Sequence, residues 1–266
     1  MRKKVGLALG AGGARGLAHI GVLQVFQEAK IPIDMIAGAS IGAIIGASYA
    51  AGSDPILMGK LACYLSQSLF IDVSLPRFGL LKGDKLTQLI RLLTHNKTFE
   101  QLQIPLAVVA TDIERAEKVV FTEGDLTSAV RASSSIPGIF RPLRYNDRLL
   151  VDGAVIERLP IITLKEMGAD LIIGVDVKTW PSEPVKVTNI YEVIMQSIEV
   201  LENEVCRKFF EMADFLICPQ LDQVGTLEFQ KAEECIKVGR EAALTKIELL
   251  KKAVALDLDS LENQVS

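Results

Sequence analysis

Residues 35–50, MIAGASIGAIIGASYA, carry the clearest signal of both the fold and the chemistry. Its centre, Gly38-Ala39-Ser40-Ile41-Gly42, fits the pattern G-x-S-x-G between an apolar strand (35–39) and an apolar helix (41–51). Such a turn lifts a serine hydroxyl to the N-terminus of a helix, where backbone N–H groups favour developing negative charge. Ser40 is therefore a candidate nucleophile, and a plain helix N-cap is the simpler alternative.

The same region is uncharged from Met35 to Ser53 and could be mistaken for a membrane span. It is at the short limit for crossing a bilayer and is interrupted by several glycines and serines. A strand, a tight turn and a buried helix explain it better, so we expect any membrane contact to be peripheral.

Short apolar runs alternate with helical periodicity over the rest of the N-terminal two thirds. This order predicts an α/β fold with a mostly parallel sheet covered by helices on both faces. Strands are expected at 5–9, 35–39, 105–111, 118–122, 148–151 and 171–177. Helices are expected at 17–30, 41–51, 54–70, 85–94, 126–134 and 161–167, with a loop at 76–83.

A composition change near Trp180-Pro181 suggests a division of the chain. We expect a catalytic unit over residues 5–178 and a helical C-terminal extension over 179–266, packed on the same domain. Within the extension, residues 189–212 and 227–254 have helical periodicity, and 215–218 has the pattern of a short strand.

Composition excludes several classes of protein. Apolar residues make up 49% of the chain and charged residues 23%, which favours a large core over disorder. The net charge of −4 argues against a nucleic-acid-binding face. Four cysteines without a C-x-x-C pair fit free thiols in a reducing compartment. The apolar run at 5–9 is too short for a signal peptide, so a cytoplasmic protein is expected.

A second glycine-rich turn, Gly10-Ala11-Gly12-Gly13-Ala14-Arg15-Gly16, also connects a strand to a helix. In one interpretation, backbone N–H groups of this loop form an oxyanion hole, because glycine permits close approach and unusual backbone angles. A dinucleotide site is the alternative, but G-x-G-x-x-G counted from Gly10 requires a glycine where Arg15 stands. A turn without a ligand is the simplest interpretation.

A nucleophilic serine needs a base, and the chain has only two histidines. His19 lies inside a predicted helix, and His95 at the end of another. The best carboxylate is Asp152, which ends an apolar strand and precedes Gly153, at the edge of the sheet where α/β folds hold their sites. Partial desolvation there raises the basicity of a carboxylate. A turn aspartate is the alternative interpretation of Asp152.

Taken together, these motifs resemble the patatin-like phospholipase family, and most of all its bacterial members similar to neuropathy target esterase. The matching segments, in the family's order, are LGAGGARGLAHIGVLQ (9–24), AGASIGA (37–43), AVVATD (107–112), VRASSSIPGIF (130–140) and LLVDGA (149–154). The resemblance covers about residues 5–178.

The resemblance implies a three-layer α/β/α fold and a serine hydrolase acting on carboxylic esters of lipids through a Ser-Asp dyad. Carried over residue by residue, Ser40 is the nucleophile and Asp152 the base, and Gly12, Gly13 and Ala14 form the oxyanion hole. No cofactor or metal, calcium included, is expected in the chemistry. Two positions depart from the family's pattern: Ala11 and Ala154 stand where many members have glycine.

Other polar residues near these motifs are expected to be structural. Asp112 and Asp176 follow strands and are interpreted as caps of turns or helices. Arg15 is expected to pair with a surface acid, and Arg131 and Ser133–Ser135 to support Asp152. The apolar segments 57–70 and 78–81 could line an acyl pocket or touch a membrane, with core packing as the simpler interpretation.

The preferred hypothesis is therefore hydrolysis of a lipid ester through an acyl-Ser40 intermediate. One rival is a non-enzymatic regulatory or scaffold protein on the same fold, and a weaker one is a dinucleotide-binding enzyme. Phospholipase, lysophospholipase, thioesterase and acyltransferase outcomes stay open, as do the acyl chain, the head group and the oligomeric state.

Overall fold

The computed structural model describes residues 2–64, 80–178 and 187–262. Its centre is one sheet of eight strands in the order β5-β6-β3-β2-β1-β7-β8, with β4 also paired to β3. The strands are β1 (Val5–Leu9), β2 (Met35–Ala39), β3 (Leu106–Asp112), β4 (Glu117–Phe121), β5 (Leu143–Tyr145), β6 (Arg148–Asp152), β7 (Leu171–Val175) and β8 (Phe215–Ile217).

The sheet is parallel in the middle and antiparallel at one side. Strands β3, β2, β1, β7 and β8 are joined by parallel pairings. The pairings β3–β4, β3–β6 and β5–β6 are antiparallel. The α/β class and the strands of the parallel part were predictable from their buried runs, whereas the sequence pattern did not reveal the antiparallel side or the strand at 143–145.

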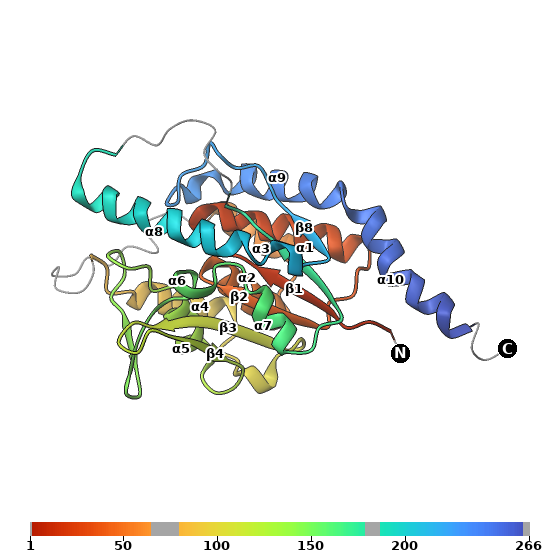
Figure 1. Ribbon diagram of the computed structural model, residues 1–266, viewed down its shortest axis with the longest axis horizontal. Helices are drawn as coiled ribbons and strands as arrows, with labels where there is room; N and C mark the ends of the chain where they lie inside the picture. Colours follow the sequence, from red (N-terminus) through yellow and green to blue (C-terminus); the bar gives the residue numbers. More distant parts are fainter. Residues whose placement is uncertain (1, 65–79, 179–186, 263–266) are drawn as a thin grey trace.

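Helices connect and cover these strands, as Figure 1 shows. The α-helices are α1 (Ala18–Glu28), α2 (Ile41–Ala50), α3 (Pro55–Tyr64), α4 (Asp84–Leu93), α5 (Leu126–Ser133), α6 (Ala154–Glu157), α7 (Ile161–Glu166), α8 (Ile190–Arg207), α9 (Ala232–Leu244) and α10 (Ile247–Glu262). Short 3-10 helices are η1 (Gly13–Leu17), η3 (Phe99–Gln101), η4 (Phe210–Met212) and η5 (Phe229–Lys231).

The two largest clusters of the apolar core lie on opposite faces of the sheet. Because successive side chains of a strand point to opposite faces, Val5, Leu7 and Leu9 of β1 join the larger cluster, and Ala8 joins the smaller. The larger cluster includes residues of α1, α2 and α9, and the smaller includes Ile161 and Leu164 of α7. The predicted coverage of both faces is confirmed.

The C-terminal residues pack against the sheet and the N-terminal helices. Strand β8 pairs with β7, and α9 lies along α1 (Figure 1). The predicted helix 227–254 is divided in the structure into η5, α9 and α10. The division of the chain at residue 178 stays a prediction.

Several predictions can be compared with the structure only in part. Residues 65–70 of the predicted helix 54–70 and residues 76–79 of the predicted loop lie outside the described residues. The stretch 35–53 folds as β2, a turn and α2, as predicted. No helix within the ranges described is both long enough and apolar enough to cross a membrane.

Candidate active site

Ser40 stands alone between β2 and α2 with an unusual backbone conformation. Strand β2 ends at Ala39 and α2 begins at Ile41, while Ser40 has φ 54° and ψ −124°. A positive φ is costly for a residue with a β-carbon and persists only where the surrounding structure enforces it. The Ser40 side chain is also buried, with 5% of the residue exposed. This is the geometry expected for the serine of a nucleophile elbow.

Gly42 explains how the first turn of α2 comes close to the sheet. A β-carbon added at Gly42 would lie 2.1 Å from the carbonyl oxygen of Leu9, the last residue of β1. Any larger residue would push the helix away from the strand, and Ser40 with it. The other motif glycine of the turn, Gly38, lies in β2 as predicted.

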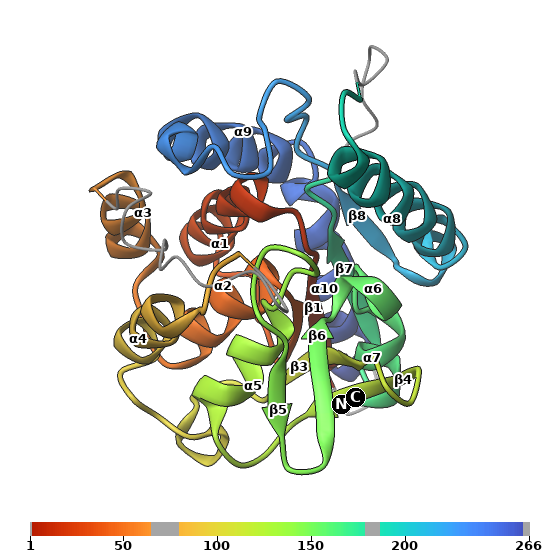
Figure 2. The same ribbon diagram turned by 90° about the vertical axis from the view of Figure 1, so that its left-hand side faces the viewer.

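Asp152 is the last residue of β6, and its carboxylate contacts Ser40 directly. The Ser40 hydroxyl donates to Asp152 Oδ2 over 2.6 Å, and the amide of Ala154 donates to Oδ1 over 2.8 Å. Only 3% of Asp152 is exposed. Residues 112 positions apart in sequence therefore meet in a buried pair. Figure 2 shows β6, which carries Asp152, paired with β5 in a hairpin.

The environment of Asp152 makes it a better base than an ordinary carboxylate. Burial raises its pKa from 3.8 to about 7, although the hydrogen bonds from Ser40 and Ala154 oppose the shift. The negative charge of Glu202 adds to the rise and the positive charge of Lys178 opposes it. A carboxyl group with a pKa near neutrality is suited to accepting and returning a proton at physiological pH.

Serines at the end of α5 and just after it bind the backbone of both members of this pair. Ser133 Oγ accepts the amide N–H of Ser40 over 2.9 Å, and the carbonyl of Ser133 accepts that of Gly153 over 3.3 Å. The carbonyl of Ser135 accepts the amide of Asp152 over 3.0 Å, and Arg131 donates to Ser135 Oγ over 2.6 Å. The predicted supporting role of this segment is confirmed and extends to Ser40.

The glycine loop is fixed at several points. The amide of Gly10 donates to Val175 O over 3.1 Å, and that of Ala14 donates to Thr226 O over 2.8 Å. Gly13 has φ 58°, and a β-carbon there would lie 2.3 Å from Thr226 O. The conformation and the close approach thus both require glycine.

The three predicted oxyanion donors therefore differ in the structure. The Ala14 amide already has Thr226 as its acceptor. Within the described part of the chain, no hydrogen bond engages the amides of Gly12 and Gly13. Gly13 lines the same cavity as Ser40. Among the described residues, the amides of Gly12 and Gly13 thus have no acceptor and could serve an oxyanion hole, whereas the Ala14 amide is already engaged.

Arg15 and Gly16 follow in η1. The Arg15 guanidinium donates to Val224 O over 2.7 Å and lies 3.9 Å from Glu199 of α8. The expected pairing of Arg15 with an acid is found, and the hydrogen bond to Val224 adds a contact with the C-terminal part of the chain.

Neither histidine is placed as the base. His19 is fully buried and its Nε2–H donates to Gly10 O over 2.8 Å, so it supports the glycine loop. Burial lowers the pKa of His19 to about 4, which keeps it neutral at physiological pH. His95 Nε2 instead contacts Ser53 Oγ over 3.1 Å.

The other strand-end carboxylates are structural, as predicted. Asp112 Oδ1 accepts the amides of Glu114 and Arg115 and caps their turn. Asp176 Oδ1 accepts the amide of Lys178, and both Asp176 oxygens accept from Arg158 in a buried bidentate pair at 2.5 and 2.9 Å. This pair joins the end of β7 to the segment that follows Asp152.

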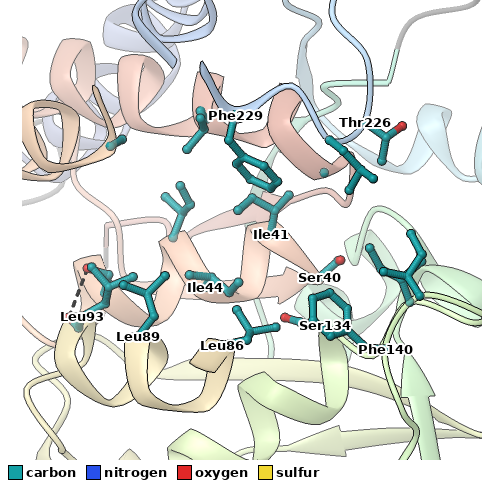
Figure 3. A pocket seen from close by; sticks show the side chains of 18 of the residues that line it. Ser40, Ile41, Ile44, Leu86, Leu89, Leu93, Ser134, Phe140, Thr226 and Phe229 are labelled. Carbon is teal, nitrogen blue, oxygen red and sulfur yellow. Dashed lines mark hydrogen bonds between the residues drawn. The ribbon is translucent and has the colours of Figure 1, made fainter. Parts of the chain in front are cut away.

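An apolar cavity of about 410 Å³ opens beside Ser40 (Figure 3). Ser40, Gly13, Thr226 and Phe140 lie along it, and Met58, Leu61, Leu80 and Leu81 contribute from the segments that sequence linked to an acyl pocket. Core packing therefore does not fully explain these segments, since Leu80 is 52% exposed and also lines the cavity. The volume is in the range of small-molecule sites.

Two features of the site were not predicted. The residues 224–226 reach the glycine loop from more than 200 positions away, and nothing in the local pattern marks them. The sequence also showed no sign that one face of α2 lines the cavity, because its apolar residues have the pattern of residues buried in a core. No group of three or more acidic, histidine or cysteine side chains within the described ranges could hold a metal ion.

Comparison with known proteins gives consistent relatives. The family model described as patatin-like phospholipase matches residues 7–165. An uncharacterised NTE family protein of Mycobacterium tuberculosis is 37% identical over 185 residues, which are 69% of this chain and 51% of that protein. A protein named lysophospholipase NTE1 from Pyricularia oryzae is 29% identical over 96% of this chain and 19% of its own length. The chain thus spans about half of the first relative and about a fifth of the second.

Solved structures with low sequence identity share the fold. VipD from Legionella pneumophila superposes with a TM-score of 0.65 at 14% identity, over 93% of this chain and 67% of VipD. The type III effector protein ExoU gives a TM-score of 0.51 at 15% identity, over 94% of this chain and 53% of that structure.

Proposed function

The chain belongs to the patatin-like phospholipase family and has its fold, and from this premise we propose that it hydrolyses carboxylic esters of lipids. Ser40 is the nucleophile and Asp152 the base. The observation that carries the proposal is the 2.6 Å hydrogen bond between Ser40 Oγ and Asp152 Oδ2 in a buried site that opens into an apolar cavity. The named lysophospholipase relatives support lipid esters as the substrate class.

In the acylation step, Asp152 accepts the Ser40 hydroxyl proton as Ser40 Oγ bonds to the ester carbonyl carbon. The carbonyl oxygen gains the negative charge, which the amides of Gly12 and Gly13 stabilise. When the intermediate collapses, the carbon–oxygen bond to the alcohol breaks. The departing alkoxide takes the proton from Asp152, and an acyl-Ser40 ester is left.

In the second step, Asp152 accepts a proton from water as the water oxygen attacks the acyl-Ser40 carbonyl. The same amides hold the second oxyanion. Collapse breaks the bond to Ser40 Oγ, which regains the proton from Asp152, and the carboxylic acid leaves. An alcohol in place of water would give acyl transfer by the same route.

Apolar residues near the cavity support peripheral contact with a lipid surface. Leu61, Leu80 and Leu227 line the cavity and are 36%, 52% and 53% exposed. Leu57 and Tyr64 on α3 are 62% and 87% exposed. A lipid surface would cover this patch while the ester reaches Ser40.

A reducing, cytoplasmic location is proposed from the cysteines. Cys63, Cys206, Cys218 and Cys235 are all free. Reduced thiols are usual in the cytosol and unusual in secreted domains.

Release of fatty acid from lysophosphatidylcholine and from short p-nitrophenyl esters tests the proposal. We expect turnover by the wild-type protein and a loss of about 10³-fold or more in Ser40→Ala and Asp152→Asn. Exposed counterparts, Ser197→Ala and Asp147→Asn, control for the chemical change and should keep wild-type rates. A folded wild-type protein without ester turnover would favour the scaffold hypothesis, and near-normal turnover by Asp152→Asn would exclude the dyad.

A further inference from the structure

One face of α2 runs along the cavity from the nucleophile inward. Ser40 and the α2 residues Ile41, Ile44, Ile45 and Ser48 all line it, at the spacing of a single helix face. Ser48 is the α2 member farthest along the helix from Ser40. Figure 3 shows Ser40 towards one end of the cavity and Leu89 and Leu93 of α4 at the other.

The hydroxyl groups that line the cavity are paired within the protein. Ser48 is 1% exposed, and its hydroxyl donates to Leu93 O over 3.2 Å. Ser134, nearer the nucleophile, donates to Val130 O over 2.8 Å. These hydroxyls are therefore already paired within the protein and do not call for a polar ligand.

Among the described residues that line the cavity, none is charged and none is a histidine. A phosphate or an ammonium group would be buried there without a partner, at a high cost in free energy. The part of a substrate that enters the cavity is therefore its hydrocarbon chain, and the head group stays on the other side of Ser40.

We infer that the cavity along α2 limits the length of the acyl chain that the protein binds, and that Ser48 and Leu93, at its far end, are the residues that determine this specificity. This inference rests on the proposed function. Eight residues of helix rise about 12 Å. An extended chain advances about 1.2 Å per bond, so about ten chain atoms separate an ester on Ser40 from Ser48. The preferred acyl groups are thus of medium length, near ten carbons.

A series of p-nitrophenyl esters from acetyl to hexadecanoyl, kept below their micelle concentrations, tests this inference. We expect kcat/KM of the wild type to rise about fourfold per methylene up to about ten carbons, and then to level or fall. Ser48→Leu should move the optimum two to three carbons shorter, because its side chain fills the far end. Leu93→Ala should move it longer by a similar amount.

Leu92→Ala is the matched control, since Leu92 is 66% exposed and does not line the cavity. Its chain-length profile should equal that of the wild type. The Ser48 variant leaves Leu93 O with a donor, because Ser53 Oγ also donates to it over 3.3 Å. Thermal melting of each variant identifies any variant that fails to fold. If Ser48→Leu fails to fold, the opposite shift expected in Leu93→Ala still tests the inference.

A binding measurement separates this inference from the proposed function. Titration calorimetry of fatty acids of 6 to 16 carbons into Ser40→Ala should give the same optimum near ten carbons, without any catalysis. Ester turnover that rises with chain length up to hexadecanoyl, equally in all variants, would overturn the inferred chain-length limit but not the proposed hydrolysis. The same binding optimum in a protein without ester turnover would overturn the proposed hydrolysis but not the chain-length limit.

Discussion

At the residue scale, burial shifts the pKa values of two ionisable groups near the site in opposite directions, which suits them to different roles. Burial raises the pKa of Asp152 to about 7 and lowers that of His19 to about 4. Asp152 touches the Ser40 hydroxyl, whereas His19 holds the carbonyl of Gly10. The proposed proton acceptor is thus the group whose pKa lies near neutrality, and the neutral histidine supports the loop.

The first prediction concerns the pH dependence of the rate. The base must be unprotonated, so kcat/KM for a soluble ester should rise about tenfold per pH unit below 7 and level above it. His19 is already neutral above pH 5 and should add no second step between pH 5 and 9. A pH–rate profile measured with stability checked at each pH tests this, and a flat profile from pH 5 to 8 would contradict it.

The second prediction concerns stability. The folded protein binds the Asp152 proton more tightly than the unfolded chain does, because its pKa is raised. The unfavourable contribution of this carboxylate is absent below its unfolded pKa, grows as the pH rises from about 4 to 7 and is complete above 7. Asp152→Asn removes it and should raise the free energy of unfolding by up to about 4 kcal/mol above pH 7, and by less than half of that at pH 5.

Urea denaturation of both proteins at pH 5 and pH 8 measures this difference. Asp147→Asn, at a side chain with 79% exposure, is the control for the substitution itself and should leave the free energy of unfolding nearly unchanged. An Asp152→Asn variant that is less stable than the wild type at pH 8 would show that the hydrogen bonds of the carboxylate outweigh its burial.

At the scale of elements, the junction of β2 and α2 presents Ser40, the proposed nucleophile. The helix reaches the end of β1 because Gly42 carries no side chain at the contact with Leu9 O. At Gly46, one turn later, the three atoms nearest to an added β-carbon all belong to side chains, and the nearest is Ile36 Cγ2 at 3.1 Å. These two glycines of one helix therefore tolerate a methyl group differently.

The third prediction follows from this difference. Gly42→Ala should displace the start of α2, lower the melting temperature and abolish ester turnover. Gly46→Ala should be much milder, because Ile36 can shift and alanine favours a helix by about 1 kcal/mol over glycine. Melting curves and initial rates of both variants test this, and equal effects of the two substitutions would refute the role given to the close contact.

The sequence predicted the junction well and the supporting contacts poorly. The buried runs at 5–9 and 35–39 coincide with β1 and β2, because continuous apolar stretches bounded by turns leave little ambiguity. Ser40 and Asp152 could be found because each stands at a strand end within a motif. Thr226 and Val224 could not, since their contacts depend on how distant segments meet.

At the scale of the whole molecule, the C-terminal residues complete the site. Strand β8 extends the sheet, and the segment before η5 supplies the carbonyl that fixes Ala14. The buried pair of Arg158 and Asp176 joins β7 to the residues after Asp152. The antiparallel side of the sheet was missed for the same reason as Thr226: pairings between distant strands leave no local pattern.

The fourth prediction concerns this buried pair. Asp176→Asn leaves the Arg158 charge buried without its partner and should lower the free energy of unfolding by about 3–5 kcal/mol. Removing the exposed partner of Lys237, by Glu241→Gln, should cost no more than about 0.5 kcal/mol, since both side chains are more than half exposed. Urea denaturation measures both changes in the free energy of unfolding. Similar small losses in the two variants would mean that the buried pair contributes little to stability.

The central claim is that Ser40 is activated by Asp152 for acyl transfer. Labelling with a fluorophosphonate probe, followed by intact mass and peptide mapping, tests it most directly. We predict one adduct, on the peptide containing Ser40, that is absent in Ser40→Ala and forms far more slowly in Asp152→Asn. A folded wild-type protein that takes up no probe, or an adduct that persists in Ser40→Ala, would contradict the account.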